Sequence, residues 1–303
     1  MTKQLAAISL ALAVPFLASA QCPANPLATL AGSSWAFQYH TPSSGIAAIG
    51  TFTATLESGR GILRGTETVN NNGQIALRAP FAGYYVMNSD CNGGELLFNL
   101  GGNSIQLDFY LTQGAKSQSE MRFVADSFNG TVPLAVQNAR QVLGRVPGIS
   151  VFVGLATRNP PSVCPPVFAD PAQSINSRWL FSTSSFGSPA FAPGVIISAD
   201  YAIAGIFQTD FLGSNRPGLL TFQETISAEG DRFNVNAPPR NPVRGVTGSG
   251  SYTVLPNCPG GDLLFNNNVL PIQYAYVFTE NQDTMYMLSL SSNYLLFGDA
   301  TRK

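Results

Sequence analysis

Hydrophobic and polar residues alternate along much of this chain with the two-residue period of a half-buried β-strand. Residues 105–111 read Ile-Gln-Leu-Asp-Phe-Tyr-Leu, so every second side chain is aliphatic or aromatic. Residues 50–56 and 62–69 are rich in threonine and flank the sequence Ser-Gly-Arg-Gly, and residues 71–73 read Asn-Asn-Gly. Glycine and asparagine at such positions favour tight hairpin turns. The pattern therefore predicts many short antiparallel strands.

One segment of this pattern occurs twice. Residues 83–98 read GYYVMNSDCNGGELLF, and residues 250–265 read GSYTVLPNCPGGDLLF. Further matching segments precede and follow this pair in the same order, which indicates a tandem duplication. Each copy has room for about seven to nine short strands. The fold class that we predict is all-β, with two tandem antiparallel β-barrel or sandwich domains at residues 21–159 and 163–303.

A helical pattern interrupts the first of these domains. Apolar residues between positions 132 and 143 recur every three or four residues, with Thr131 as a cap and Gly144 as a stop. We expect one short helix here. It could act as a lid or bind a partner, but packing over one end of the barrel is the interpretation that we favour.

The first 20 residues have the features of a secretory signal peptide. A lysine at position 3 precedes an apolar stretch from residue 5 to residue 17, and Ala-Ser-Ala at 18–20 suits signal cleavage. The stretch is too short to span a bilayer comfortably, and no later segment is long and apolar enough to do so. We therefore expect a secreted, extracellular protein without a transmembrane segment, in a compartment where disulfides persist.

Composition narrows the possible partners. Charged residues make up 11% of the chain and the formal net charge is −1, so we expect no basic surface for nucleic acid. Hydrophobic residues make up 45%, which allows large cores and argues against a disordered chain. The sequence has no glycine-rich phosphate loop and no calcium-binding loop. It assigns no catalytic residue, no cofactor and no metal.

The four cysteines can pair in three ways. The duplication selects one of them, because each copy has one cysteine near its start and one in its repeated strand. The predicted disulfides are Cys22–Cys91 and Cys164–Cys258, each of which joins an N-terminal segment to the sheet. A zinc site is the alternative, but the sequence lacks clustered histidines. Asn129, in Asn-Gly-Thr, is the predicted N-glycosylation site.

Two glutamates are candidates for chemistry because both copies place Glu-Thr before a β-branched residue. Glu67 and Glu224 lie in predicted strands, and a carboxylate inside a barrel could act as a general base or hold the polar end of a ligand. The alternative, which we favour, is a structural ion pair with Arg158 and Arg302, which also occur in both copies. The only histidine, His40, is expected in a surface loop.

Glycine, tyrosine, aspartate and cysteine occur at fixed spacing within residues 83–91, and Gly-x-Ala-x-Arg follows at residues 154–158. In this combination the first copy resembles small secreted β-domains of bacteria and fungi, a family whose function is uncharacterised. In the second copy Asn257 replaces the aspartate, while Gly-x-Ala-x-Arg recurs at residues 298–302. The resemblance implies a compact barrel of lipocalin-like shape and brings no catalytic residue with it.

Three functions are compatible with these features. The first, which we rank highest, is a non-catalytic secreted protein that binds cell-wall glycan or a host surface, since two linked domains gain avidity. The second is a carrier that holds a small apolar ligand inside a hollow barrel. The third is an isomerase-type enzyme that uses Glu67 or Glu224, in which case replacing either by glutamine abolishes activity without unfolding the protein.

Overall fold

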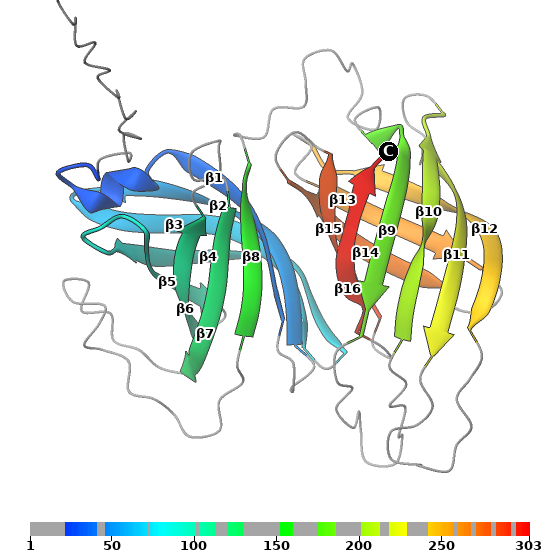
Figure 1. The fold of residues 1–303 in the computed structure, drawn as a ribbon, viewed down its shortest axis with the longest axis horizontal. Helices are drawn as coiled ribbons and strands as arrows, with labels where there is room; N and C mark the ends of the chain where they lie inside the picture. Colours follow the sequence, from blue (N-terminus) through cyan, green and yellow to red (C-terminus); the bar gives the residue numbers. More distant parts are fainter. Residues whose placement is uncertain are drawn as a thin grey trace, which may run out of the picture.

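The protein is built from two closed antiparallel β-barrels of eight strands each, one after the other along the chain (Figure 1). This arrangement confirms the predicted fold class. The computed structural model describes residues 22–40, 46–71, 73–100, 103–112, 120–129, 152–159, 175–185, 201–212, 218–228, 242–256, 260–267, 271–279, 283–291 and 295–303. The predicted signal peptide, the expected helix at 132–143, Cys164 and Cys258 lie outside these residues.

Barrel 1 consists of strands β1 to β8, each hydrogen-bonded to the next, and β8 closes the barrel by pairing with β1. The strands are β1 (Ser33–His40), β2 (Ile46–Glu57), β3 (Arg60–Asn71), β4 (Gln74–Met87), β5 (Gly93–Leu100), β6 (Asn103–Thr112), β7 (Glu120–Asn129) and β8 (Phe152–Asn159). A short 3-10 helix, η1 (Pro26–Thr29), precedes β1 and is the only helix among the described residues.

Barrel 2 consists of β9 to β16 with the same order of neighbours, and β16 closes it by pairing with β9. The strands are β9 (Arg178–Ser184), β10 (Tyr201–Asp210), β11 (Gly218–Ala228), β12 (Val243–Val254), β13 (Gly260–Asn266), β14 (Ile272–Phe278), β15 (Thr284–Ser289) and β16 (Phe297–Arg302). Every strand therefore has two neighbours, and neither barrel leaves an open sheet edge.

Aromatic rings fill the described interior of each barrel. In barrel 1, Phe37 packs against Phe52 and Phe98 with ring centroids 5.8 and 5.7 Å apart. In barrel 2, Phe265 packs against Phe181 and Phe207 with centroids 5.2 and 5.5 Å apart. Rings at these separations make edge and offset contacts and bury a large apolar area. They belong to the apolar core that lies inside each barrel.

The segment that precedes each barrel covers one of its ends. In barrel 1, the disulfide Cys22–Cys91 ties this segment to the turn after β4, which confirms that predicted pair. The hydroxyl of Tyr85 donates to the carbonyl oxygen of Leu27 at 2.8 Å. In barrel 2, the indole nitrogen of Trp179 donates to the carbonyl oxygen of Ile175 at 3.1 Å. Both glutamate candidates lie toward the opposite ends.

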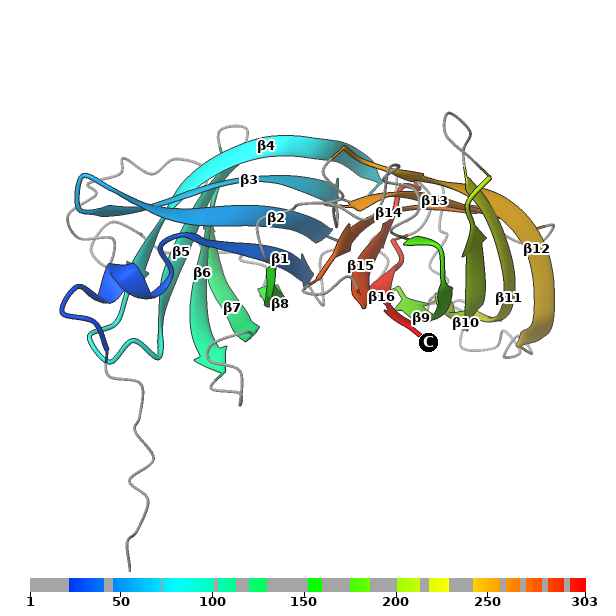
Figure 2. The ribbon, with the colours of Figure 1, turned by 90° about the horizontal axis from the view of Figure 1, so that it is seen from above.

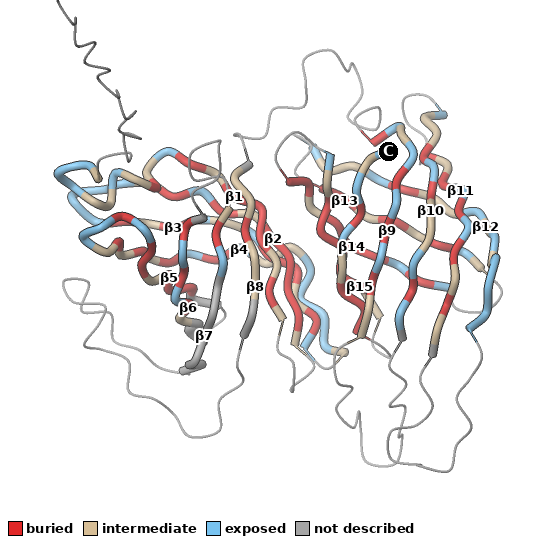
Figure 3. Tube along the Cα trace, viewed as in Figure 1, coloured by how far each residue is buried: buried red, intermediate tan, exposed pale blue. Residues whose placement is uncertain are grey.

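The two barrels pack side by side through an apolar interface (Figure 2). As a result, β1 and β2 carry buried residues on their outer faces as well as their inner faces (Figure 3). The buried residues of this interface are Ala36, Ala47 and Ile49 from barrel 1 and Ala275, Tyr286, Leu288, Leu295 and Phe297 from barrel 2. Polar contacts lie beside them. The side-chain amide nitrogen of Asn70 donates to the backbone carbonyl oxygens of Ser289 and Ser291 at 3.2 and 3.0 Å.

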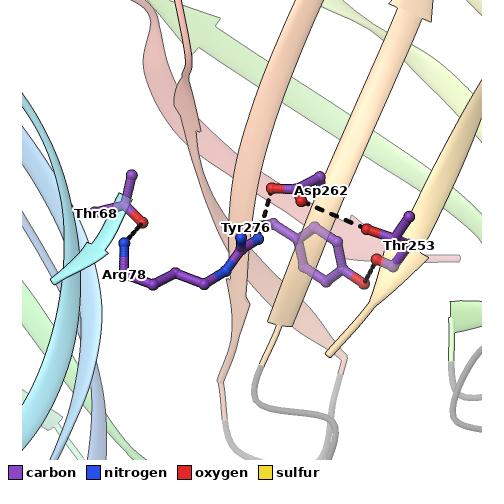
Figure 4. A network of polar contacts seen from close by, with 5 residues as sticks. All are labelled: Thr68, Arg78, Thr253, Asp262 and Tyr276. Carbon is purple, nitrogen blue, oxygen red and sulfur yellow. Dashed lines mark hydrogen bonds and ion pairs between the residues drawn. The ribbon is translucent and has the colours of Figure 1, made fainter. Parts of the chain in front are cut away.

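A β-bulge in β4 supplies a further contact between the barrels (Figure 4). The register between β3 and β4 shifts after Glu67, and Arg78 lies in the bulge with a left-handed φ of 49°. Its side chain extends to barrel 2 and forms an ion pair of 2.6 Å with Asp262. Barrel 2 has a matching register shift after Glu224, where Gly245 takes the left-handed conformation with φ 68°. Glycine adopts this conformation at little cost, whereas arginine is strained in it.

Candidate functional site

Glu67 is buried inside barrel 1, where it is 2% exposed. Glu67 is paired with Gly50 on the adjacent strand β2, and Gly50 is paired in turn with Phe37 on β1, so the three residues form one row across the strands. A Cβ atom at position 50 would lie only 2.6 Å from the ring of Phe37. Glycine at this position therefore makes space for the ring. The hydroxyl of Tyr39 donates to Oε2 of Glu67 at 3.3 Å.

Burial determines the protonation of this pair. Loss of solvation raises the pKa of Glu67 to about 8, and the hydrogen bond from Tyr39 only partly opposes the shift. Burial and the neighbouring carboxyl together hold the pKa of Tyr39 well above its usual value. At pH 7 the carboxyl of Glu67 is therefore mostly neutral. A neutral carboxyl can donate a proton as a general acid, but this one is buried in the interior of barrel 1.

Glu224 occupies the equivalent place in barrel 2, opposite Gly205 and in the same row as Phe181. Its hydrogen-bond partner is different, because the side-chain amide of Asn267 donates to Oε1 at 2.5 Å. Loss of solvation raises the pKa of Glu224 to about 7, against the effect of this hydrogen bond. Both barrels thus hold a buried carboxyl with a neutral hydrogen-bond donor.

The structure does not bring the two glutamates together with Arg158 and Arg302. The residue of β8 that shares the row of Glu67 is Ala156. Arg158 lies two residues further along β8, where it is paired with Trp35 on β1. Arg302 has the corresponding place in barrel 2: its guanidinium carbon lies 5.1 Å above the ring centroid of Trp179, and its Nε lies 4.0 Å from Asp283. The arginines therefore lie toward the covered barrel ends, near the tryptophans.

His40 is not in a surface loop, contrary to expectation. It is the last residue of β1, and its ring lies 5.0 Å from that of Phe297 in barrel 2. Burial lowers the pKa of its imidazole below the usual value. Asn129, the predicted glycosylation site, is the last residue of β7. Among the described residues, no three His, Cys, Asp or Glu side chains lie close enough together to hold a metal ion.

A cavity of about 460 Å³ lies where barrel 1 meets the outer face of barrel 2. Its floor consists of two rows of outward-facing residues that cross the adjacent strands β16, β9, β10 and β11. The strand register gives the first row as Asp299, Ser182, Ala204 and Thr225, and the second as Phe297, Ser184, Ala202 and Ser227. Directly opposed residues on adjacent strands are about 5 Å apart. The floor is therefore broad, and apart from Phe297 and Asp299 its side chains are small, several of them with hydroxyl groups.

Barrel 1 contributes Gln38 of β1 to the wall of this cavity. The side-chain oxygen of Gln38 is buried, and no described residue donates a hydrogen bond to it. Asp299 is the only charged residue among the described lining residues. It is exposed to solvent at its strand position, yet the protein atoms around the hollow raise the pKa of its carboxyl through loss of solvation.

No pattern in the sequence predicts this cavity. The available signal was weak: four of the outward-facing positions of β9 and β10 carry small residues, which are Ser182, Ser184, Ala202 and Ala204. Small residues on the solvent side of a strand are ordinary, and only the neighbouring barrel turns this surface into a hollow. Elsewhere among the described residues, no helix is long and apolar enough to cross a membrane.

Comparisons with known proteins identify no family for this chain. No family model matches it, and no curated protein matches it. Among solved structures, kievitone hydratase from Nectria haematococca is similar over 90% of this chain and 89% of its own, with 11% identity and a TM-score of 0.26. A protein of unknown function from the DUF3598 family of Nostoc punctiforme is similar over 92% and 98%, with 9% identity and a TM-score of 0.18. At these scores neither likeness bears on the function of this chain.

Proposed function

We propose that this protein is a secreted binding protein whose ligand is a small polyhydroxylated molecule, such as a short saccharide, held in the cavity between the barrels. The observation that carries the proposal is the composition of the cavity floor. The hydroxyls of Ser182, Ser184, Thr225 and Ser227 are spread over neighbouring strands. Each can donate and accept a hydrogen bond, which matches the alternating needs of sugar hydroxyls.

The shape of the cavity also supports a binding role. Its volume falls within the range of pockets that hold small ligands, about 300–1,000 Å³. The floor belongs to barrel 2 and the wall residue Gln38 to barrel 1, so the binding surface depends on both barrels. Their apolar interface and the Arg78–Asp262 ion pair hold the two parts in place before a ligand arrives. Preorganisation of this kind reduces the entropic cost of binding.

Secretion is part of the proposal. It is supported by the signal-like sequence at residues 1–20 and by the disulfide Cys22–Cys91, since such bonds persist outside the cytosol. In an extracellular setting, free saccharides and the ends of cell-wall glycans are available as ligands. The aromatic packing within the barrels favours this external site over a cargo carried inside a barrel.

Backbone amide NMR spectra test this proposal directly. Cellobiose, diacetylchitobiose and the corresponding glucosamine disaccharide are each titrated to about 10 mM. We expect at least one of them to shift the amide signals of Ser182, Ser184 and Thr225, in a saturable manner. Ala204→Trp places a large side chain on the cavity floor and should abolish the shifts.

Gln208→Trp is the matched control. Gln208 is exposed on the same strand but does not line the cavity, so this variant should bind normally. If none of the three disaccharides shifts the cavity signals, or if Ala204→Trp binds as well as the unchanged protein, the proposal is wrong.

A further inference from the structure

The single acidic residue among the described lining residues, Asp299, indicates which class of ligand the cavity binds. An inference from it rests on the proposed binding function. Asp299 begins the first row of the floor and lies directly opposite Ser182 on β9. Side chains in this relation are about 5 Å apart, so one small ligand can contact both. The remaining described lining residues are neutral, with hydroxyl, amide or apolar side chains.

Among the residues that the structure describes, no Lys or Arg forms an ion pair with the carboxylate of Asp299. On the β15 side its neighbour in register is Tyr286, whose hydroxyl lies 2.6 Å from that of Thr157 in barrel 1. On the β9 side its neighbour is Ser182. The loss of solvation that raises its pKa is the cost that a bound cation would offset.

We infer that the cavity binds a hydroxylated amine, with the ammonium group at Asp299 and the hydroxyls of the ligand over Ser182 and Thr225. An amino sugar has this combination of groups. The first row of the floor offers a partner for each of these groups. Asp299 lies at one edge of the row, Ser182 is on the adjacent strand, and Thr225 is two strands beyond Ser182. Phe297, two residues before Asp299 on the outer face of β16, also lines the cavity, although most of its side chain is buried in the interface between the barrels.

The three disaccharides named above are similar in size but differ in charge, so they test whether the charge of the ligand affects binding. The glucosamine disaccharide carries ammonium groups, its acetylated form carries neutral amides, and cellobiose carries hydroxyls alone. We expect the glucosamine disaccharide to bind roughly three- to tenfold more tightly than the other two at pH 7. This ratio corresponds to an ion pair at a solvent-accessible position.

Asp299→Asn keeps the size of the side chain and its capacity for hydrogen bonds but removes the charge. It should lower the affinity for the glucosamine disaccharide to the affinity that the same variant has for cellobiose. Asp108→Asn removes one charge from the exposed face of β6, outside the cavity lining, and serves as the control. It should bind like the unchanged protein. Amide spectra of both variants verify that the fold is intact.

Other outcomes would overturn this inference in distinguishable ways. Equal binding of all three disaccharides would overturn the ammonium site and leave the proposed binding function standing. Binding of none would overturn both. Spermidine, an amine without hydroxyls, is the remaining probe. If it binds in the cavity as tightly as the glucosamine disaccharide, the hydroxyl rows play no part and the inferred ligand class is wrong.

Discussion

At the scale of single residues, the buried glutamates show how the environment changes a common side chain. Glu67 is buried inside barrel 1, and its hydrogen-bond donor is the neutral Tyr39 in place of the arginine that the sequence suggested. A carboxyl in such a place remains protonated because its charged form would lose solvation without gaining a cation. The duplicated position Glu224 keeps the carboxyl but uses Asn267 as the donor.

This environment predicts a dependence of stability on pH. The pKa of Glu67 is about 8 in the folded protein and close to 4.5 when unfolded. The folded state therefore holds the proton more tightly, and its contribution to stability is complete below pH 4.5 and is lost as the pH rises toward 8. We expect the free energy of unfolding to fall by several kcal/mol, on the order of 4, between these limits. Urea denaturation at pH 5, 7 and 8.5 measures it.

Glu67→Gln should remove most of this slope, because glutamine stays neutral throughout the range. Glu57→Gln is the control: Glu57 is exposed, and its hydrogen bond from Arg64 lowers its pKa, so this change should leave the slope unaltered. Glu224→Gln should remove a smaller part, since its pKa is about 7. A slope that is as steep in both single variants as in the unchanged protein would contradict the assignment.

At the scale of elements, the bulge in β4 links a local irregularity to the contact between the barrels. It turns Arg78 out of the ladder so that its backbone nitrogen donates to the hydroxyl of Thr68 at 3.2 Å and its guanidinium reaches Asp262. Asp262 also lies near Thr253, whose backbone oxygen accepts a hydrogen bond from Tyr276 at 3.0 Å. The strained backbone of Arg78 is thus associated with an ion pair that Gly245 could not form.

A double-mutant cycle measures this link. Arg78→Gly relieves the left-handed strain but removes the ion pair, and Asp262→Asn removes the ion pair alone. The two side chains are 27% and 26% exposed, so we expect a coupling energy of about 1 kcal/mol, in the range of partly exposed pairs. Arg78→Gly should be less destabilising than Arg78→Ala because only the former suits the bulge. A coupling energy near zero would mean that the pair does not contribute to stability.

At the scale of the whole molecule, the interface makes the two barrels one unit. Ile49 is 1% exposed although its side chain points away from the core of barrel 1. Apolar contacts of this kind couple the unfolding of adjoining domains. The cavity between the barrels has a defined shape only while this contact persists.

Calorimetry tests the coupling. The unchanged protein should unfold in a single transition, whereas Ile49→Glu should separate it into two, because a buried charge without a partner disrupts the interface. Thr53→Glu introduces the same side chain on the outer face of β2 at an exposed position and should keep one transition. Two transitions in the unchanged protein would show that the barrels unfold independently. Ile49→Glu should also abolish any saccharide-induced shifts in the cavity.

The sequence by itself determined the two barrels and the first disulfide. Alternation of polar and apolar residues dictates which side chains of a strand face inward, and this depends only on neighbours along the chain. The repeated cysteine strand was sufficient to predict Cys22–Cys91. The duplication drew attention to Glu67 and Glu224, because both copies place Glu-Thr before a β-branched residue, and the structure buries both carboxyls.

Only the tertiary structure decided what these positions meet. The partner of Glu67 is a residue of β1, some thirty positions away along the chain, and its identity follows from the register and from the bulge beside it. His40 was expected in a surface loop, and no sequence pattern drew attention to Ser182 or Asp299. The packing of one barrel against the other partly buries His40 and places Ser182 and Asp299 in a cavity. Inward faces are fixed by local periodicity, whereas the surroundings of an outward face depend on how complete domains pack together, and no local pattern encodes that arrangement.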